Sequence, residues 1–291
     1  MRVVTKKGKA LQHVVCTFDG LSELTDWLEK TPTDKTGNDL ASQAHHGDKV
    51  WDFELGYKGS LDLINNGWEK GAQEIEKLRN KQVGDIANGY AEVSQPEWNR
   101  DVAGDAVDVG AFLSGEPECM LVREEEEVNV PVVEIWFRLG CPANVEGKQL
   151  MNQGVAMLAA IDKIEAQGIR VKLVAWYQGW GRHRSTVKDR RFHFSCVVKR
   201  ADEPLHLHTL AFAIAHPAFF RRLVFAVIER QGDKDQTGAF TDGGYGGIEQ
   251  RIDQIPNAIP QDVMVVNPNW DATIETSYRK TVQDIQRKAA A

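Results

Sequence analysis

The strongest constraint on the fold is a strand–helix–strand pattern in the middle of the chain. Val130–Leu139 (VPVVEIWFRL) is an apolar, β-branched and aromatic run, and Ile169–Tyr177 (IRVKLVAWY) alternates like a strand. Between them, apolar residues recur at helical spacing over Gly147–Gln167, and Gly168 follows where a helix end favours glycine. Because a helix that connects two nearby strands normally makes a right-handed crossover, we expect the strands to pair in parallel.

The residues that follow extend this unit. Phe192–Lys199 reads as a strand that pairs with Ile169–Tyr177 as an antiparallel hairpin with a long arm. Two consecutive helices are expected over Leu205–Ala215 and Ala218–Arg230, divided by His216-Pro217, and an amphipathic helix over Ala272–Ala291. The predicted fold class is therefore α/β, α+β overall, with a mixed sheet and helices packed on it.

The first 129 residues give weaker signals. A short strand is predicted at Val14–Phe18, a helix at Leu21–Lys30, and a helical stretch at Ser60–Asn80 that breaks near Asn66-Gly67. Val83–Arg123 reads as irregular or short-stranded. We expect three regions: 1–129 as an α+β region packed on the core, 130–231 as the α/β core, and 232–291 as a glycine-rich loop with a helical tail.

Charge is unevenly distributed along the chain. The 291 residues include 35 Lys and Arg against 42 Asp and Glu, a net charge of −7. Glu97–Glu127 holds ten acids and two bases, whereas Gln178–Arg200 holds seven bases and one acid. Fields from charges more than about 10 Å away are largely screened at physiological salt, so a basic segment can attract a polyanion although the chain as a whole is acidic.

The basic segment is the strongest candidate site. In Tyr177–Phe194 (YQGWGRHRSTVKDRRFHF), Trp180 stands between two glycines and is followed by alternating cations. Aromatic rings that stack on bases and cations that pair with phosphates are how proteins hold single-stranded nucleic acid. A solvated hairpin tip is the alternative interpretation. The predicted nucleic-acid-binding residues are Tyr177, Trp180, Arg182, His183, Arg184, Lys188, Arg190 and Arg191. Further bases could come from the chain ends, at Lys6, Lys7, Lys9, Arg287 and Lys288.

Other groups of polar residues give less specific signals. Arg221 and Arg222 lie beside large apolar residues and either reach a partner or lie at the edge of the core, which we favour. The consecutive acids Glu124 to Glu127 read as an exposed loop, with a contact for a basic partner or a decoy for the basic arm as alternatives. The histidines that could bind a metal if the fold brought them together are His45, His46, His206, His208 and His216.

Neither catalysis nor a cofactor is indicated. The chain contains none of the motifs GxSxG, GxxxxGK[ST], HExxH and GxGxxG, so we expect a protein that is not an enzyme and binds no cofactor or metal. Four cysteines without a CxxC pair favour a reducing cytoplasm over a disulfide scaffold. We find no apolar run of signal-peptide or membrane-spanning length.

Two resemblances suggest functions. The layout over Val130–Arg230 resembles half of a von Willebrand A-type fold, although Leu139, Gly140, Cys141, Pro142 and Ala143 replace that family's metal-binding Asp-x-Ser-x-Ser. This resemblance implies a non-catalytic interaction scaffold.

The second resemblance covers most of the chain. Arg200–Arg230 (RADEPLHLHTLAFAIAHPAFFRRLVFAVIER), with CTFDGLSELTDWLEKTP and NNGWEKGA earlier, is similar to a family of bacteriophage and mobile-element proteins. Within it, the chain resembles the single-stranded DNA-binding cofactors with which some podophages recruit their RNA polymerase to melted promoters. The resemblance implies single-stranded DNA and a phage RNA polymerase as partners, transcription regulation as the role, and the host cytoplasm as the location. RNA in place of DNA stays open, as does self-association through the C-terminal helix.

Overall fold

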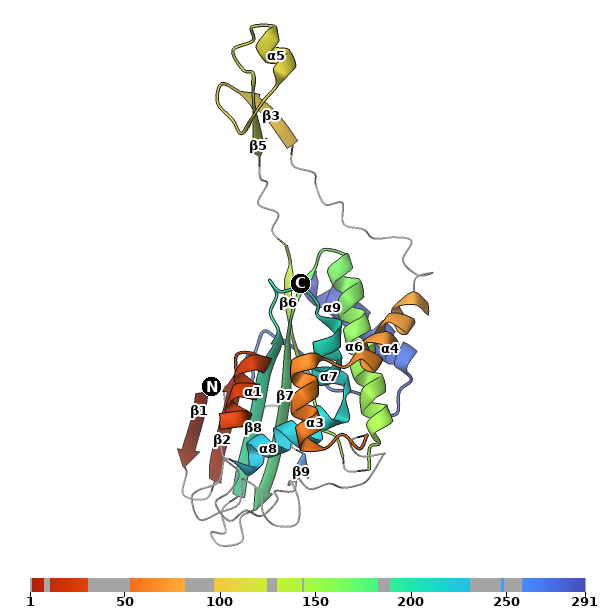
Figure 1. The fold of residues 1–291 in the computed structure, drawn as a ribbon. Helices are drawn as coiled ribbons and strands as arrows, with labels where there is room; N and C mark the ends of the chain where they lie inside the picture. Colours follow the sequence, from red (N-terminus) through yellow and green to blue (C-terminus); the bar gives the residue numbers. More distant parts are fainter. Residues whose placement is uncertain are drawn as a thin grey trace.

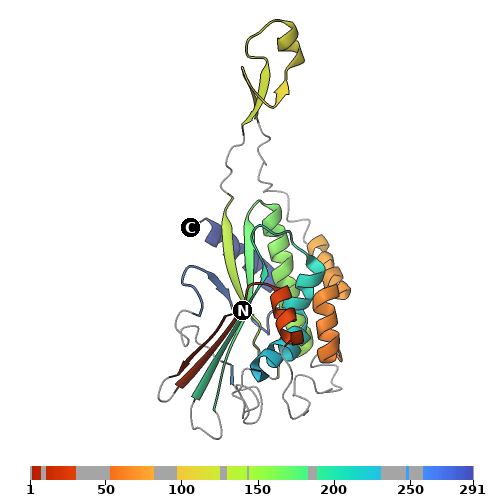
Figure 2. The same ribbon diagram turned by 60° about the vertical axis from the view of Figure 1, so that its left-hand side comes forward.

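A mixed sheet runs through the main body of the protein, and helices cover one of its faces (Figures 1 and 2). The structure is a computed structural model, and it describes residues 2–7, 11–30, 53–81, 97–124, 130–142, 144–182, 189–230, 247–248 and 258–290. The sheet has the strand order β1-β2-β8-β7-β6-β10, and β9 (Gly247–Ile248) pairs with β7 beyond the end of β6.

The central strands confirm the predicted unit. Strand β6 (Val132–Arg138) pairs in parallel with β7 (Arg170–Arg182), and helix α6 (Gly147–Ala166) connects them. Strand β8 (Asp189–Lys199) returns antiparallel to β7 as the predicted hairpin. At the edge, β10 (Met264–Val266) pairs in parallel with β6. The fold class is thus α/β with a mixed sheet, as the sequence indicates.

The N-terminal strands belong to this same sheet. Strand β2 (Leu11–Phe18) lies parallel to β8, and β1 (Arg2–Lys7) pairs antiparallel with β2 at the other edge. Residues before and after the region boundary expected at residue 129 therefore contribute strands to one and the same sheet. The sequence predicts only Val14–Phe18 as a strand here, because nothing local indicates which distant strand a segment will pair with.

Helices from both halves of the chain cover one face of the sheet. They are α1 (Leu21–Lys30), α3 (Gly56–Asn66), α4 (Glu69–Lys81), α6, α7 (Leu207–Ala215) and α8 (Phe225–Glu229), with a π-helical stretch at Phe219–Val224 before α8. The predicted break between α3 and α4 falls at Gly67, whose φ of 82° suits glycine. The main core lies between these helices and the sheet.

The C-terminal helix α9 (Ile274–Ala289) packs on α6 through the face predicted from its periodicity. Tyr278, Val282 and Ile285 on this face are buried. In the part of the chain that the structure describes, no single helix has the length and apolar character to cross a membrane. Among the described residues, the helical segments Leu207–Ala215 and Phe219–Ile228 reach that length and apolar character only when taken together, and a bend of 64° separates them.

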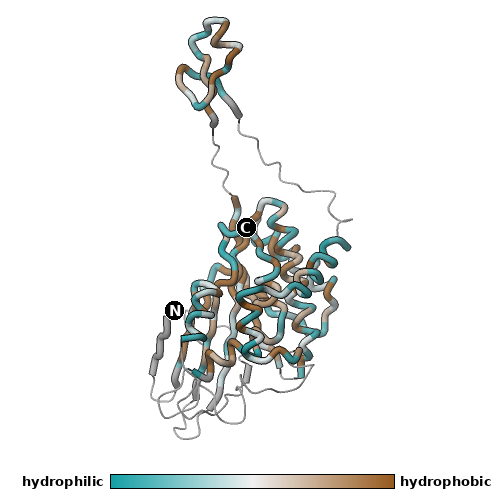
Figure 3. The backbone as a smooth tube through the Cα atoms, viewed as in Figure 1, coloured by the Kyte–Doolittle hydropathy of each residue, from teal (hydrophilic) through white to brown (hydrophobic). Residues whose placement is uncertain are grey.

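Residues 97–124 form a small three-stranded unit with the strand order β3-β5-β4, where the sequence indicates irregular or short-stranded structure. It consists of β3 (Glu97–Asp101), β4 (Ala106–Val107), the short helix α5 (Val109–Leu113) and β5 (Met120–Glu124). In Figures 1 and 3 it stands apart from the main sheet, beyond the start of β6.

Candidate nucleic-acid interface

The candidate interface lies on the face of the sheet opposite the helices, which we call the second face. Because strand side chains alternate, Trp176, Gln178 and Trp180 of β7 share this face. Their partners across the ladder to β8 are Ser195, His193 and Arg191, in that order. Strand β2 contributes His13, Val15 and Thr17 in register with the same β8 residues.

One end of the second face is covered. The indoles of Trp136 and Trp176 are buried there, packed against Val197, Ile259, Val263 and Val265. The Trp176 Nε1 donates a hydrogen bond to the Trp136 carbonyl at 3.1 Å, and the Arg138 guanidinium lies 5.4 Å from the Trp176 ring centroid. These two tryptophans are therefore structural and not available for stacking on a ligand.

A buried polar pair lies between the covered end and the open end. The Gln178 amide nitrogen donates to the His193 Nδ1 at 3.1 Å, and both side chains are buried. Burial lowers the pKa of His193 to about 3, so its imidazole is neutral near pH 7. Its ring stacks 6.5 Å from that of Trp176. Among the residues that the structure describes, neither the His193 Nε2 nor the Gln178 Oε1 has a hydrogen-bond partner.

The open end carries a row of aromatic and basic positions. Trp180 of β7 is in register with Arg191 of β8, Arg191 with His13 of β2, and His13 with Lys6 of β1. We call these four positions the Trp180 row. The Trp180 side chain is 51% exposed, and the other large apolar residues with comparable exposure among those described lie at the start of β6 or in residues 97–124. An indole so exposed on a sheet face can stack on a planar ligand.

The structure corrects part of the predicted site. Tyr177 is wrong as a nucleic-acid-binding residue, because strand alternation turns it toward the helices, where its ring packs 5.0 Å from that of Phe220. Its burial raises the pKa of its phenol. Gly179 lies inside the paired strand, and a Cβ there would overlap the Tyr177 hydroxyl. The glycines beside Trp180 thus belong to a regular ladder and not to a loop that orders on contact.

The remaining predicted residues divide into two groups. Arg182 and Arg190 occupy ladder positions opposite Asp189 and Gly181, and Arg191 is half-buried in the Trp180 row. The predicted residues outside the described part of the chain are His183, Arg184 and Lys188. Sequence reasoning misses His13 as a member of the row. The alternation of its strand places it opposite the buried Val14 and Cys16, but only the pairing of β2 with β8 brings it to Arg191.

The other candidate residues lie away from the second face. Arg221 and Arg222 are buried, and the Arg221 Nη2 donates to the Val145 carbonyl at 2.5 Å, so Arg221 serves the core and not a partner. The His208 Nδ1 lies 3.0 Å from a Glu69 carboxylate oxygen, and the His216 Nδ1 accepts the Ala218 N–H at 3.1 Å.

The candidate metal ligands do not come together within the described residues, where no group of three His, Cys, Asp or Glu could hold a metal ion. His45, His46 and Glu125 to Glu127 lie outside those residues.

Comparison with known proteins places the chain in a family without assigning an activity. No curated protein and no solved structure matches it. One family model, described as a domain of unknown function (DUF7192), matches residues 2–287. Because this match spans nearly the whole chain and includes the sheet, the helices and the 97–124 unit, the protein belongs to the DUF7192 family.

Proposed function

We propose that the protein binds single-stranded DNA at the Trp180 row and thereby assists a phage RNA polymerase at melted promoters. The observation that supports binding most directly is the half-exposed indole of Trp180, in register with Arg191 on the face that the helices leave open. The polymerase part of the proposal rests on the resemblance to phage single-stranded DNA-binding cofactors.

The row combines the two interactions that unpaired strands need. Stacking of a base on an aromatic ring contributes about 1–3 kcal/mol and tolerates any base. The positions of Lys6 on β1, Arg182 on β7 and Arg191 on β8 lie on this face and supply cations for phosphates, whereas alternation places Arg190, in register with Gly181, on the other face. Stacking on Trp180 requires a base whose face is free, which a duplex does not offer along its length. We therefore expect a preference for single strands with little sequence preference.

The test is fluorescence anisotropy of a labelled single-stranded oligonucleotide with wild-type protein and Trp180→Ala. A stacking loss of about 1–3 kcal/mol corresponds to a Kd roughly 5- to 150-fold weaker. Phe112→Ala is the matched control, because that ring is 63% exposed but lies in the 97–124 unit. Wild-type affinity in Trp180→Ala, or an equal loss in Phe112→Ala, would refute the proposal.

A second pair of variants separates the charge contribution. Arg182→Ala with Arg184→Ala should flatten the dependence of log K on log salt by about 0.7 for each phosphate that is no longer neutralised. Lys58→Ala with Lys70→Ala removes two exposed charges from α3 and α4 on the helical side, so the slope should not change. If the two double variants show the same dependence of log K on log salt, then Arg182 and Arg184 do not bind phosphates.

The rival proposal is a non-catalytic interaction scaffold on a degenerate von Willebrand A-like layout. It predicts no affinity for single strands at physiological salt. The recruitment part has its own test on a pre-melted promoter template with the phage polymerase. Wild-type protein should stimulate transcription, and Trp180→Ala should not.

A further inference from the structure

The 97–124 unit exposes an unusual amount of apolar surface. Of the eight large apolar residues that are exposed in the described part of the chain, five lie in it: Val102, Val107, Val109, Phe112 and Leu113. In the same unit, Ala111 alone belongs to the buried hydrophobic residues. Single exposed apolar residues are normal on a protein, but a concentration of them indicates a contact surface.

Three of these side chains are presented together. Val109, Phe112 and Leu113 of α5 follow the i, i+3, i+4 spacing of one helix face, and we call them the knob. Their exposed fractions are 64%, 63% and 79%. Residues of this spacing are the anchors with which a helix enters an apolar groove.

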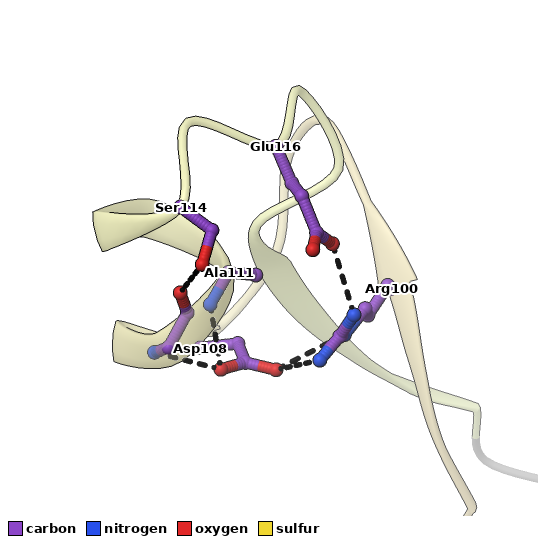
Figure 4. Close-up of polar contacts among 6 residues, drawn as sticks. Arg100, Asp108, Ala111, Ser114 and Glu116 are labelled. Atoms are coloured by element: carbon purple, nitrogen blue, oxygen red, sulfur yellow. Dashed lines mark hydrogen bonds and ion pairs between the residues drawn. The ribbon is translucent and has the colours of Figure 1, made fainter.

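Polar contacts, not a core, hold the knob in place (Figure 4). The Asp108 carboxylate caps α5 by accepting the Gly110 and Ala111 N–H groups at 3.0 and 3.2 Å. The Arg100 guanidinium joins Asp108 at 2.6 Å and Glu116 at 3.0 Å. The Ala111 backbone hydrogen bond and Arg100 lower the pKa of Asp108. The knob is therefore fixed at neutral pH with its apolar face outward.

The unit that carries the knob is acidic. Residues 97–124 include seven acids and two bases. Arg100 is engaged with Asp108 and Glu116, whereas Asp105 and Glu118 are exposed and form no ion pair with any residue that the structure describes. A surface that fits the knob should consequently be an apolar groove with a basic rim.

The same chain has a groove of this kind between β10 and α9. It has a volume of about 500 Å³ and is open to solvent. Its apolar lining residues are Met264, Val265, Val266, Pro268 and Ala272, and the other lining residues are polar or charged. Strand β10 pairs with β6 on one side only, so it is an edge of the described sheet. The lining residues of α9 recur along one side of the helix from Thr276 to Lys288.

The rim of the groove is basic. Lys280 and Lys288 are exposed and form no ion pair within the described residues, and Arg287 pairs with Asp284 at 3.5 Å. The two unpaired ammonium groups thus complement the two unpaired carboxylates of Asp105 and Glu118. In Figure 1 the 97–124 unit stands apart from its own chain's sheet, so neither surface covers the other within one molecule.

We propose that the knob of one molecule binds in the groove of a second copy. The two surfaces differ, so the contact is head-to-tail, and each bound copy leaves one knob and one groove free for the next. The contact is small, which predicts weak association in the micromolar range. Because ion pairs contribute, association should weaken as salt increases.

Sedimentation velocity without DNA, from micromolar to hundreds of micromolar protein, tests this proposal. Wild-type protein should form larger species as the concentration rises. Phe112→Ser with Leu113→Ser, which removes the knob, and Lys280→Glu with Lys288→Glu, which reverses the rim, should each stay monomeric. All four side chains are exposed, so these changes leave the core intact.

Mixing the two variants gives the decisive result. One retains its groove and the other its knob, so a mixture should stop at a one-to-one dimer. Arg279→Glu reverses an exposed charge of α9 outside the groove lining, and it should associate like the wild type. As a second route, Asp105→Lys with Glu118→Lys should abolish self-association. Its mixture with the Lys280→Glu, Lys288→Glu variant should grow beyond the one-to-one dimer, because the reversed knob then matches the reversed rim.

Three outcomes would overturn the proposal. If the wild-type protein is monomeric at every concentration, self-association is excluded. The same result would be seen if the knob bound the groove of its own molecule, and it overturns the proposal in that case too. Failure of the mixed variants to form a dimer would exclude the head-to-tail contact. Loss of DNA affinity in the Lys280→Glu, Lys288→Glu variant with unchanged sedimentation would show that the groove binds nucleic acid. Trp180→Ala should self-associate normally, so this test and that of DNA binding fail independently.

Discussion

Acid should destabilise the protein through His193, because the fold holds this imidazole in a site that tolerates only its neutral form. The side chain is fully buried, and the Gln178 amide occupies its Nδ1. Tryptophan rings lie 6.1 and 6.5 Å from the imidazole, at Trp136 and Trp176. None of these neighbours carries a negative charge that would stabilise an imidazolium.

The magnitude follows from the difference between the two states. In the unfolded chain a histidine has a pKa of about 6.5, whereas in the folded protein the pKa of His193 is about 3. Above pH 6.5 the group is neutral in both states and contributes no pH dependence. Below pH 6.5 the unfolded chain binds the proton first, which favours unfolding. At pH 5 the loss is about 2 kcal/mol, and it grows until the pH reaches about 3.

Urea unfolding at pH 7.5 and pH 5.0 measures this loss. His193→Gln removes the titrating group, so the variant should lose about 2 kcal/mol less than the wild type on acidification, whatever the substitution costs at pH 7.5. His206→Gln, at an exposed position, should retain the wild-type pH dependence. The reasoning is refuted if wild type and His193→Gln lose the same stability between the two pH values.

Two further predictions concern the packing beneath the sheet. The Lys199 Nζ lies 2.5 Å from a Glu165 carboxylate oxygen with only 1% of its side chain exposed, so Lys199→Met should cost about 3–5 kcal/mol in urea unfolding. Lys172→Met, at a pair that is 36% exposed on the lysine side, should cost at most about 1 kcal/mol. At Gly154 a Cβ would overlap Ala215 of α7, so Gly154→Ala should lower the Tm through a loss of about 1–3 kcal/mol, whereas Gly20→Ala, whose Cβ would meet nothing within 3.4 Å, should not.

The elements that the sequence predicts well are those whose signals are local. Helix α6, the strands on either side of it and the glycine break between α3 and α4 each follow from periodicity or from one residue type within a short window. The pairing of β2 with β8 and of β10 with β6 joins segments far apart in the chain, and no local pattern specifies such partners. The order of the strands in the sheet therefore does not follow from local sequence patterns.

The candidate site shows the same division. The glycine neighbours of Trp180 predict an exposed indole, and it is exposed, although the reason is strand alternation in a regular ladder. Tyr177, predicted from the same segment, is buried, because strand alternation turns it toward the helices, on the face opposite Trp180. One additional step, extending the period-2 pattern from Ile169 through Trp180, separates the two faces.

The distance between the acidic 97–124 unit and the Trp180 row makes the two proposed surfaces compatible. The acidic 97–124 unit lies beyond the start of β6, whereas the Trp180 row lies near the far end of β7 (Figure 1). Trp180 is ten residues from Arg170, which pairs with the start of β6, and a strand rises about 3.3 Å per residue, so the row lies about 33 Å from that end of the sheet. That is several times the Debye length of about 8 Å at physiological salt. The acids therefore cannot repel a strand bound at the row, and the net charge of −7 does not predict the affinity of either surface.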